Sequence, residues 1–408
     1  MKIKNISITD YKGIVETLEL DFTGKNGEPL DLIVLAGPNG CGKTSVIESC
    51  SLGFIYVHQY DFPILKPNSV RRGKDNCVIQ ATLINGKELF KTTHKIMRHL
   101  EGDRETVSHS ASSSDTEECI KHMRSIQVVF FTSWRGPKLP EGVVLNPIGN
   151  DLPKTEENRL YHIVSDIVNK VAERGFPDYD PTKPDEASII LEKIINGWRI
   201  FYPEKPLDRF EARKSGEKKF NVFLNKSSSN ESIPVDSLSS GELEIFIMLG
   251  WFAVNDFDGG IVLIDEPELH LHPAWQRKIL PALQKVMPDT QIIAATHSPL
   301  ILSSVPPECI RLLEHPDNIL LQKDEKRSAD IPYASYGLDS NRILEDIMDV
   351  DERPEEIKNK FDDMFLAIDK NELNRAENIL RELKDKILDD PQLLKAEILI
   401  KRKVTIGK

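Results

Sequence analysis

Residues Leu35–Thr44 read LAGPNGCGKT, a glycine-rich loop that follows the apolar run 32–36 and ends in Lys43 and Thr44. This is a complete P-loop, in which a buried strand leads into a loop that curls around phosphate oxygens. Glycines tolerate the backbone conformations of such a loop, so that successive N–H groups can point inward. The helix expected after the loop adds the positive end of its dipole. The sequence therefore predicts a phosphate-binding site here.

The polar side chains of the loop have separate predicted tasks. Lys43 is placed to neutralise the charge of the β- and γ-phosphates, and the Thr44 hydroxyl is placed to ligate Mg²⁺. ATP and Mg²⁺ are thus the predicted ligands. The residues expected to bind the nucleotide in this part of the chain are Asn39, Gly40, Cys41, Gly42, Lys43, Thr44 and Ser45.

Two further apolar runs end in polar residues suited to phosphate chemistry. The run 261–264 ends at Asp265 and Glu266, and the run 291–295 leads into His297 within the sequence THSP. In a P-loop protein the first carboxylate belongs on Mg²⁺, and the second is positioned to polarise the attacking water. We therefore predict Asp265 as a metal ligand and Glu266 and His297 as catalytic residues. Helix-capping carboxylates and a solvated histidine are the ordinary alternatives at strand ends.

Composition favours a protein with a sizeable core and no general affinity for nucleic acid. The chain has 408 residues, of which 39% are hydrophobic and 29% charged, and its formal net charge is −12. An acidic balance implies that any contact with DNA is local. The five cysteines show no C-x-x-C spacing, which argues against a zinc site and a disulfide framework. Without a signal-peptide pattern or an apolar run of membrane-spanning length, we expect a cytoplasmic protein with no membrane partner.

The motifs GPNGCGKT, LSSGE, VLIDEPELHLHP and THSP occur in this order along the chain. Together they resemble the Walker A, signature, Walker B with D-loop, and H motifs of ABC-type ATPases, specifically the soluble branch of RecF-like, SMC-like and overcoming-lysogenization-defect-like proteins. The resemblance implies two heads that pack head to tail around two ATP molecules, with Ser239 and Gly241 of one copy reaching the γ-phosphate held by the other. Ser240 and Glu242 replace the glycine and glutamine of transporter-type signatures, as is familiar in the soluble branch.

The predicted fold is α/β: an ABC-type ATPase head with a P-loop core sheet and an N-terminal antiparallel β subdomain, a helical lobe and a C-terminal helical appendage. Alternating segments at 3–9 and 15–22 and the Asn85-Gly86 turn indicate the antiparallel sheet. Helical spacing at 156–174 indicates the lobe. The predicted divisions are a head at 1–330, with antiparallel β and the helical lobe inserted at 60–235, and a helical partner or oligomerisation region at 331–408.

The tail from Tyr336 reads YGLDSNRILEDIM and leads into predicted amphipathic helices at 357–368, 373–388 and 391–403. It resembles the ATPase subunits of Septu-type anti-phage defence systems, which work beside a separate HNH nuclease. The resemblance implies a homodimer or higher homo-oligomer of heads, a separate HNH-type nuclease subunit, and DNA contacted through the complex. Alternatives left open are a RecF- or SMC-like DNA-repair clamp and a nucleotide-gated scaffold with little turnover.

One additional residue is a candidate sensor of the γ-phosphate or the metal. Gln127 lies beside the apolar run 128–131, near the point where related ATPases place a polar sensor. Its neighbours place it equally well as an ordinary strand residue.

Overall fold

The computed structural model describes most of the chain, namely residues 1–52, 69–86, 88–98, 105–112, 126–132, 143–144, 159–173, 185–203, 209–214, 219–226, 231–257, 259–314, 327–328, 335–339, 342–343, 354–387 and 390–406. The chain divides into two compact units, Met1–Ile343 and Leu344–Lys408. Of the tail sequence 336–348, residues 340–341 and 344–348 lie outside the described part, as do residues 156–158 and 174 of the predicted helix at 156–174 and residue 388 of the predicted helix at 373–388.

A five-stranded parallel sheet forms the centre of the first unit, in the order β14-β3-β13-β12-β7. Every residue of β3, β12 and β13 is buried, which explains their continuous apolar sequences, because parallel strands are covered on both faces. All the carboxyl ends of these strands lie at one edge of the sheet. The strands are β3 (Leu32–Ala36), β7 (Val128–Phe131), β12 (Gly260–Asp265), β13 (Thr290–Ala295) and β14 (Ile310–Leu312).

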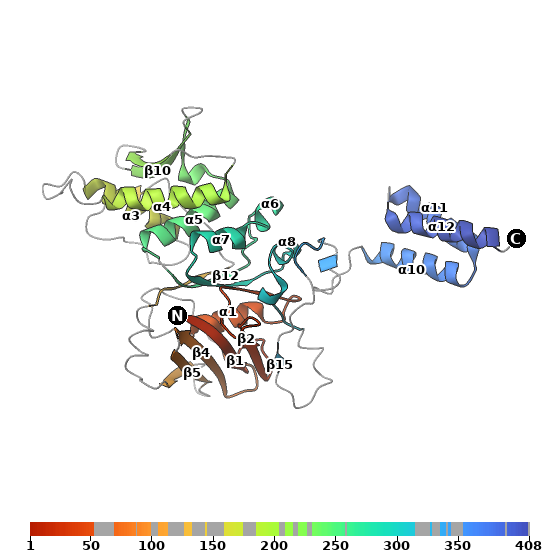
Figure 1. The fold of residues 1–408 in the computed structure, drawn as a ribbon, viewed down its shortest axis with the longest axis horizontal. Helices are drawn as coiled ribbons and strands as arrows, with labels where there is room; N and C mark the ends of the chain where they lie inside the picture. Colours follow the sequence, from red (N-terminus) through yellow and green to blue (C-terminus); the bar gives the residue numbers. More distant parts are fainter. Residues whose placement is uncertain are drawn as a thin grey trace. The chain divides into compact units, whose positions relative to one another are not determined.

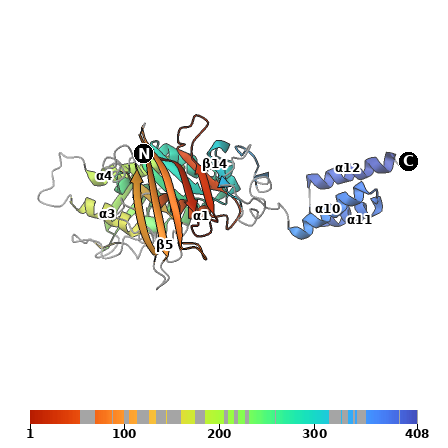
Figure 2. The same cartoon turned by 90° about the horizontal axis from the view of Figure 1, so that it is seen from below.

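A second, largely antiparallel sheet has the order β15-β2-β1-β4-β5-β6, with β15 added parallel to β2. Its burial alternates along β1 and β4, as expected for a sheet with one covered face. The predicted hairpins are present, since β1 pairs with β2, and Asn85 pairs with Glu88 across the turn at Gly86. Figure 2 shows these strands side by side. They are β1 (Lys2–Thr9), β2 (Thr17–Asp21), β4 (Asn76–Asn85), β5 (Glu88–Arg98), β6 (Glu105–Ser112) and β15 (Arg327–Ser328).

Helix α1 (Lys43–Leu52) lies between the two sheets and contacts β12 and β13 on one side and β1 and β4 on the other (Figure 1). A helical lobe lies on the other side of β12 and includes a small sheet (Figure 1). Helix α5 is apolar around its whole circumference because α3, α4 and the core enclose it. The lobe comprises α3 (Arg159–Glu173), α4 (Glu186–Phe201), α5 (Ser240–Val254), α7 (Ile279–Val286), β8 (Val143–Val144), β9 (Arg209–Lys214), β10 (Lys219–Lys226) and β11 (Glu231–Pro234).

Two short helices and one turn complete the first unit near the carboxyl edge of the core sheet. They are α6 (Pro273–Gln276) and α8 (Pro299–Leu302), together with the turn at 335–339. The turn is fixed to the segment after α8, because Ser335 Oγ donates to Val305 O at 3.3 Å and Gly337 N donates to Ser303 O at 2.9 Å. The first unit therefore continues beyond residue 330.

The second unit contains three helices with a core of their own. They are α10 (Glu355–Asp369), α11 (Leu373–Lys386) and α12 (Pro391–Ile406), close to the helices predicted from the sequence. Phe361, Met364 and Leu383 are among its buried side chains, whereas Leu394 and Ile398 are exposed on α12. Among the described helices of the chain, none is long and apolar enough to cross a membrane.

Candidate nucleotide site

The P-loop starts where β3 ends, and its first glycine has no room for a side chain. Gly37, Gly40 and Gly42 have φ values of 142°, 80° and 100°, which are backbone conformations that favour glycine. A Cβ on Gly37 would lie 2.2 Å from the carbonyl oxygen of Leu313. The residue after β14, Leu313, therefore packs directly against the start of the loop and leaves room only for glycine there. Helix α1 begins at Lys43, directly after the loop.

Lys43 is a buried cation held by neutral groups. Its Nζ donates to the carbonyl oxygens of Gly37 at 2.8 Å and Pro38 at 2.9 Å, and only 6% of the residue is exposed. Burial lowers the pKa of the ammonium, while the charges of Asp265 and Glu266 act in the opposite direction. A desolvated ammonium whose bonds go to carbonyls fits an incoming anion such as a phosphate, which would relieve the cost of burial.

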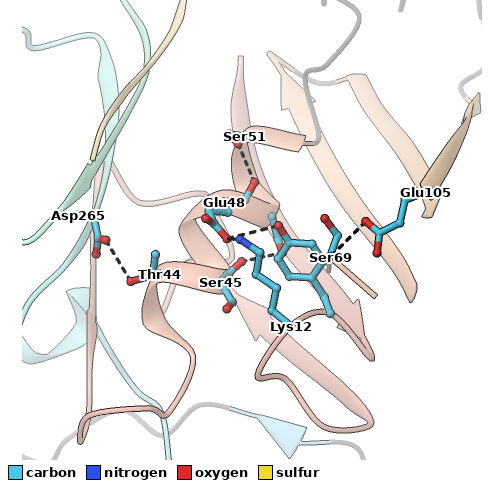
Figure 3. A network of polar contacts seen from close by, with 10 residues as sticks. Lys12, Thr44, Ser45, Glu48, Ser51, Ser69, Glu105 and Asp265 are labelled. Atoms are coloured by element: carbon cyan, nitrogen blue, oxygen red, sulfur yellow. Dashed lines mark hydrogen bonds and ion pairs between the residues drawn. The ribbon is translucent and has the colours of Figure 1, made fainter. Parts of the chain in front are cut away.

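The two predicted Mg²⁺ ligands meet across the interface of α1 and β12. Thr44 Oγ1 donates a hydrogen bond of 3.0 Å to Asp265 Oδ2, as Figure 3 shows. Asp265 is the last residue of β12 and is only 3% exposed. A carboxylate beside a hydroxyl is a hard oxygen donor set of the kind that Mg²⁺ takes in nucleotide sites. The residues present therefore fit the metal that the P-loop predicts.

Glu266 follows Asp265 in a left-handed backbone conformation, with φ of 52°. Its N–H donates to Ala295 O at 2.8 Å, so this turn is fixed to the end of β13. Burial lowers the pKa of both Lys43 and His297, and the negative charge of Glu266 opposes that lowering at each of them. The predicted catalytic carboxylate thus shares one electrostatic environment with the P-loop lysine and the histidine.

His297 lies half-buried just beyond β13, where the charges of Lys43 and Glu266 both act on its imidazole. Burial lowers its pKa, the nearby Lys43 ammonium lowers it further, and Glu266 opposes the shift. Its backbone N–H donates to Glu268 Oε1 at 2.7 Å, and Thr296 Oγ1 donates to Glu268 Oε2 at 2.8 Å. The sequence analysis did not select Glu268; its signal is that it is the third carboxylate of the stretch DEPE.

The signature segment caps α5 and packs on the turn after β12. Ser239 is the N-cap, and its Oγ accepts from Glu242 N at 3.4 Å while it donates to Glu242 Oε2 at 2.7 Å. Ser239 N also donates to Glu242 Oε2 at 3.2 Å, which completes a capping box. Ser239 is exposed, whereas Gly241 is buried, and a Cβ on Gly241 would lie 2.8 Å from His270 O.

The remaining predicted nucleotide ligands lie around the loop with different exposure. Asn39 and Gly40 are exposed, Cys41 is buried, and burial raises the pKa of the Cys41 thiol. Ser45 is buried within α1, where its carbonyl oxygen accepts a 2.8 Å bond from Ser49 Oγ. Their ligand roles remain predictions.

The hypothesis that Gln127 senses the γ-phosphate is wrong. Gln127 precedes β7, and β7 runs parallel to β12 with Val128 opposite Ile261, so Gln127 lies at the amino edge of the sheet, away from the P-loop. Its Nε2 donates to Asn255 O at 3.0 Å. Thr132 follows Phe131, the partner of Ile264, and so lies just past the carboxyl end of β7, at the edge of the sheet where Asp265 lies.

The fold and these contacts define an ABC-type ATPase. Residues 153–303 match the family model described as "AAA domain, putative AbiEii toxin, Type IV TA system". The chain is 37% identical over 400 residues to the retron Vc95 probable ATPase of Vibrio cholerae serotype O1 biovar El Tor, a match that covers 78% of this chain and 74% of that protein. The chain therefore belongs to the family of ATPases that contains the retron Vc95 protein.

A second relative matches over most of both chains. The Septu protein PtuA of Bacillus thuringiensis is 27% identical over 372 residues, which is 86% of this chain and 85% of that protein. Among solved structures, an SMC head bound to the C-terminal winged-helix domain of ScpA covers 75% of this chain and 93% of that chain, at 12% identity and a TM-score of 0.48.

Proposed function

We infer that this chain is the ATP-binding and ATP-hydrolysing subunit of a bacterial anti-phage defence complex. Nucleotide-dependent pairing of two heads would control a separate nuclease, of HNH type, that acts on DNA. The observation that carries the ATPase part is the meeting of Lys43, the Thr44–Asp265 pair, Glu266 and His297 at one edge of one parallel sheet. The defence part is supported by similarity to Septu and retron proteins.

The chain's own groups divide the work of phosphate cleavage. Lys43 offsets negative charge on the β- and γ-phosphates, Thr44 and Asp265 hold the metal, and Glu266 polarises the attacking water. When bound, Mg²⁺ supplies further charge stabilisation on the transferred phosphoryl group. Burial and the Lys43 ammonium lower the pKa of His297, which favours the neutral imidazole before nucleotide binds, and in this proposal His297 donates a hydrogen bond to the γ-phosphate.

A second copy completes the site in this proposal. Ser239 is exposed at the start of α5, where the helix N-terminus and, once it leaves Glu242, the Ser239 hydroxyl would face a phosphate held by another head. Head pairing would then depend on the γ-phosphate, since contacts from both copies are lost on hydrolysis. The helices α10 to α12 are the proposed surface for the nuclease partner or for further assembly.

Hydrolysis is tested by phosphate release with Glu266→Gln. We expect a loss of about 100-fold or more, with ATP–Mg²⁺ binding retained, because the bonds of Lys43 to Gly37 and Pro38 and the bond of Thr44 to Asp265 do not involve the Glu266 side chain. Glu88→Gln is the matched control, because Glu88 is an exposed glutamate on β5. Equal and negligible rates in the wild-type protein and Glu266→Gln would instead support a nucleotide-gated scaffold.

Assembly is tested by measuring mass in solution with and without ATP–Mg²⁺ and a candidate HNH protein. In Glu266→Gln, where hydrolysis is blocked, ATP should shift the mass to that of two chains, and Ser239→Ala should weaken the shift. Copurification of the nuclease should be lost when residues 355–408 are deleted. Copurification that survives this deletion would contradict the assignment of the C-terminal helices to the partner.

A further inference from the structure

The carboxylate of Glu268 joins the turn after β12 to the H motif. Its two oxygens accept separate hydrogen bonds, one from the His297 backbone N–H at 2.7 Å and one from the Thr296 hydroxyl at 2.8 Å. Glu268 is 28 and 29 residues from these partners along the chain, so the contact exists only because β12 and β13 pair in parallel. The side chain thus fixes the backbone from which the His297 imidazole projects.

The segment that carries Glu268 is bent at both sides of it. Glu266 and His270 have φ values of 52° and 61°, which cost free energy in residues other than glycine. Leu269 N donates to Glu266 O at 3.1 Å, and Leu271 N donates to Glu268 O at 3.0 Å, so two turns follow one another. Such a backbone persists only when surrounding contacts over-determine it, and the Glu268 carboxylate supplies two of these contacts.

A second side chain joins the same two segments a few residues away. Gln276 Oε1 accepts from Ser298 Oγ at 2.7 Å, and Gln276 Nε2 donates to Leu271 O at 3.1 Å. The Gln276 side chain bonds to Ser298, which is the N-cap of α8, and these two hydrogen bonds do not involve His297. The chain therefore offers a natural comparison between losing a contact that holds only the segment and losing a contact that also holds the histidine.

The opposite face of the bent segment contacts the signature helix. The His270 carbonyl oxygen occupies the space beside Gly241, where a Cβ would approach it to 2.8 Å. One short segment consequently contacts the signature at His270, carries Glu266 at its start and holds the His297 backbone through Glu268. The same short segment therefore joins the signature to both groups predicted to act on the γ-phosphate.

We propose that Glu268 is a positioning residue: through the His297 backbone N–H it holds His297 in place for its contact with the γ-phosphate. The inference rests on the proposed ATPase function. Glu268 itself contacts no reacting atom in this scheme, and its effect on catalysis runs through His297. The variants below measure the energetic coupling between Glu268 and His297.

Phosphate release in four variants of the full chain tests the coupling. Glu268→Ala removes both acceptors and should lower kcat by about 100-fold, with KM for ATP unchanged. Glu268→Gln keeps one acceptor oxygen for the His297 N–H, and its loss should stay below about 10-fold because a displaced group costs more than a weakened bond. In a His297→Ala background, adding Glu268→Ala should cost less than about 3-fold, since residues that act as a unit are non-additive.

Gln276→Ala is the matched control, because it breaks the neighbouring tie without touching His297. A kcat loss equal to that of Glu268→Ala would mean that any loosening of the segment suffices, and would overturn the inference. A full Glu268→Ala loss in the His297→Ala background would overturn it too. So would a Glu268→Gln variant as inactive as Glu268→Ala, since that points to a need for the charge itself.

Hydrogen exchange provides a readout that does not depend on turnover. Glu268→Ala should speed amide exchange in residues 291–300, whereas exchange in residues 37–52 should not change, and Gln276→Ala should leave the His297 amide protected. If wild-type protein releases no phosphate, the proposed hydrolysis fails while this measurement still decides the role of Glu268. Unchanged exchange in residues 291–300 would overturn the inference whether or not the protein hydrolyses ATP.

Discussion

A single methyl group at Gly37 should destabilise the unit that contains the P-loop. In Gly37→Ala the Cβ would lie 2.2 Å from Leu313 O and 3.0 Å from Cys41 Sγ. The carbonyl cannot easily move, because Leu313 N donates to Ala36 O at 2.8 Å and β14 pairs with β3 along this edge. The φ of 142° adds backbone strain. Overpacking and strain each cost about 1–3 kcal/mol, so we expect a loss of about 2–6 kcal/mol in the free energy of unfolding.

Two other glycines separate the steric contribution from the backbone contribution. Gly73 has φ of 82° but nothing within 4 Å of a Cβ, so Gly73→Ala should lose only about 1–2 kcal/mol. Gly13 has open space and no left-handed φ, so Gly13→Ala should gain about 0.4–1 kcal/mol. Guanidinium unfolding followed by tryptophan fluorescence reports on this unit, which contains Trp198, Trp251 and Trp275. Equal losses for Gly37→Ala and Gly73→Ala would refute the Leu313 contact.

Three further predictions concern buried polar groups. Arg311, 2% exposed, donates to the backbone carbonyls of several residues, so Arg311→Met should cost about 3 kcal/mol in denaturant unfolding. Gln291→Leu removes bonds to both backbone groups of Ile3 and to Leu30 O, and should cost about 2–3 kcal/mol in the same measurement. Burial raises the pKa of Glu268 above its ordinary value of 4.5, so the folded state binds that proton more tightly than the unfolded state. The protonated Glu268 carboxyl contributes its full stabilisation below pH 4.5, and this contribution is lost as the pH rises through the pKa of the folded state. When the free energy of unfolding is measured at increasing pH from 4.5 upward, Glu268→Gln should therefore become more stable relative to wild type.

The parts of the fold that depend only on neighbouring residues were predictable from the sequence. The strand before the P-loop is a run of fully buried apolar residues, and so is the strand before Asp265. The Asn85-Gly86 turn and the amphipathic C-terminal helices also follow from short-range signals, since turn chemistry and helical periodicity need only neighbouring residues. The motif order then implied the ABC-type fold, although no single motif fixes it.

Direction and long-range contacts were harder to predict. Gln127 was selected because it borders an apolar run. Only the parallel pairing of β7 with β12 shows that it lies at the amino edge of the sheet. The contact of Glu268 with Thr296 and His297 depends on the register of β12 with β13, in which Asp265 lies opposite Ala295. Neither pattern is visible in a window of ten residues, because strand order sets both.

The capping box defines a condition for the pairing of two heads. The Ser239 hydroxyl has a single proton, which it donates to the Glu242 carboxylate at 2.7 Å. It can donate to a phosphate on another copy only after leaving Glu242, and a bond to a charged acceptor is worth about 1.5–3 kcal/mol. The Glu242 carboxylate also repels an approaching phosphate, whereas the N-terminus of α5 attracts it. In the proposed pairing, contacts around the nucleotide at two sites would have to offset this cost. Ser239→Ala removes the hydroxyl and with it this cost, so its effect on the ATP-dependent mass shift measures the net contribution of the Ser239–phosphate contact.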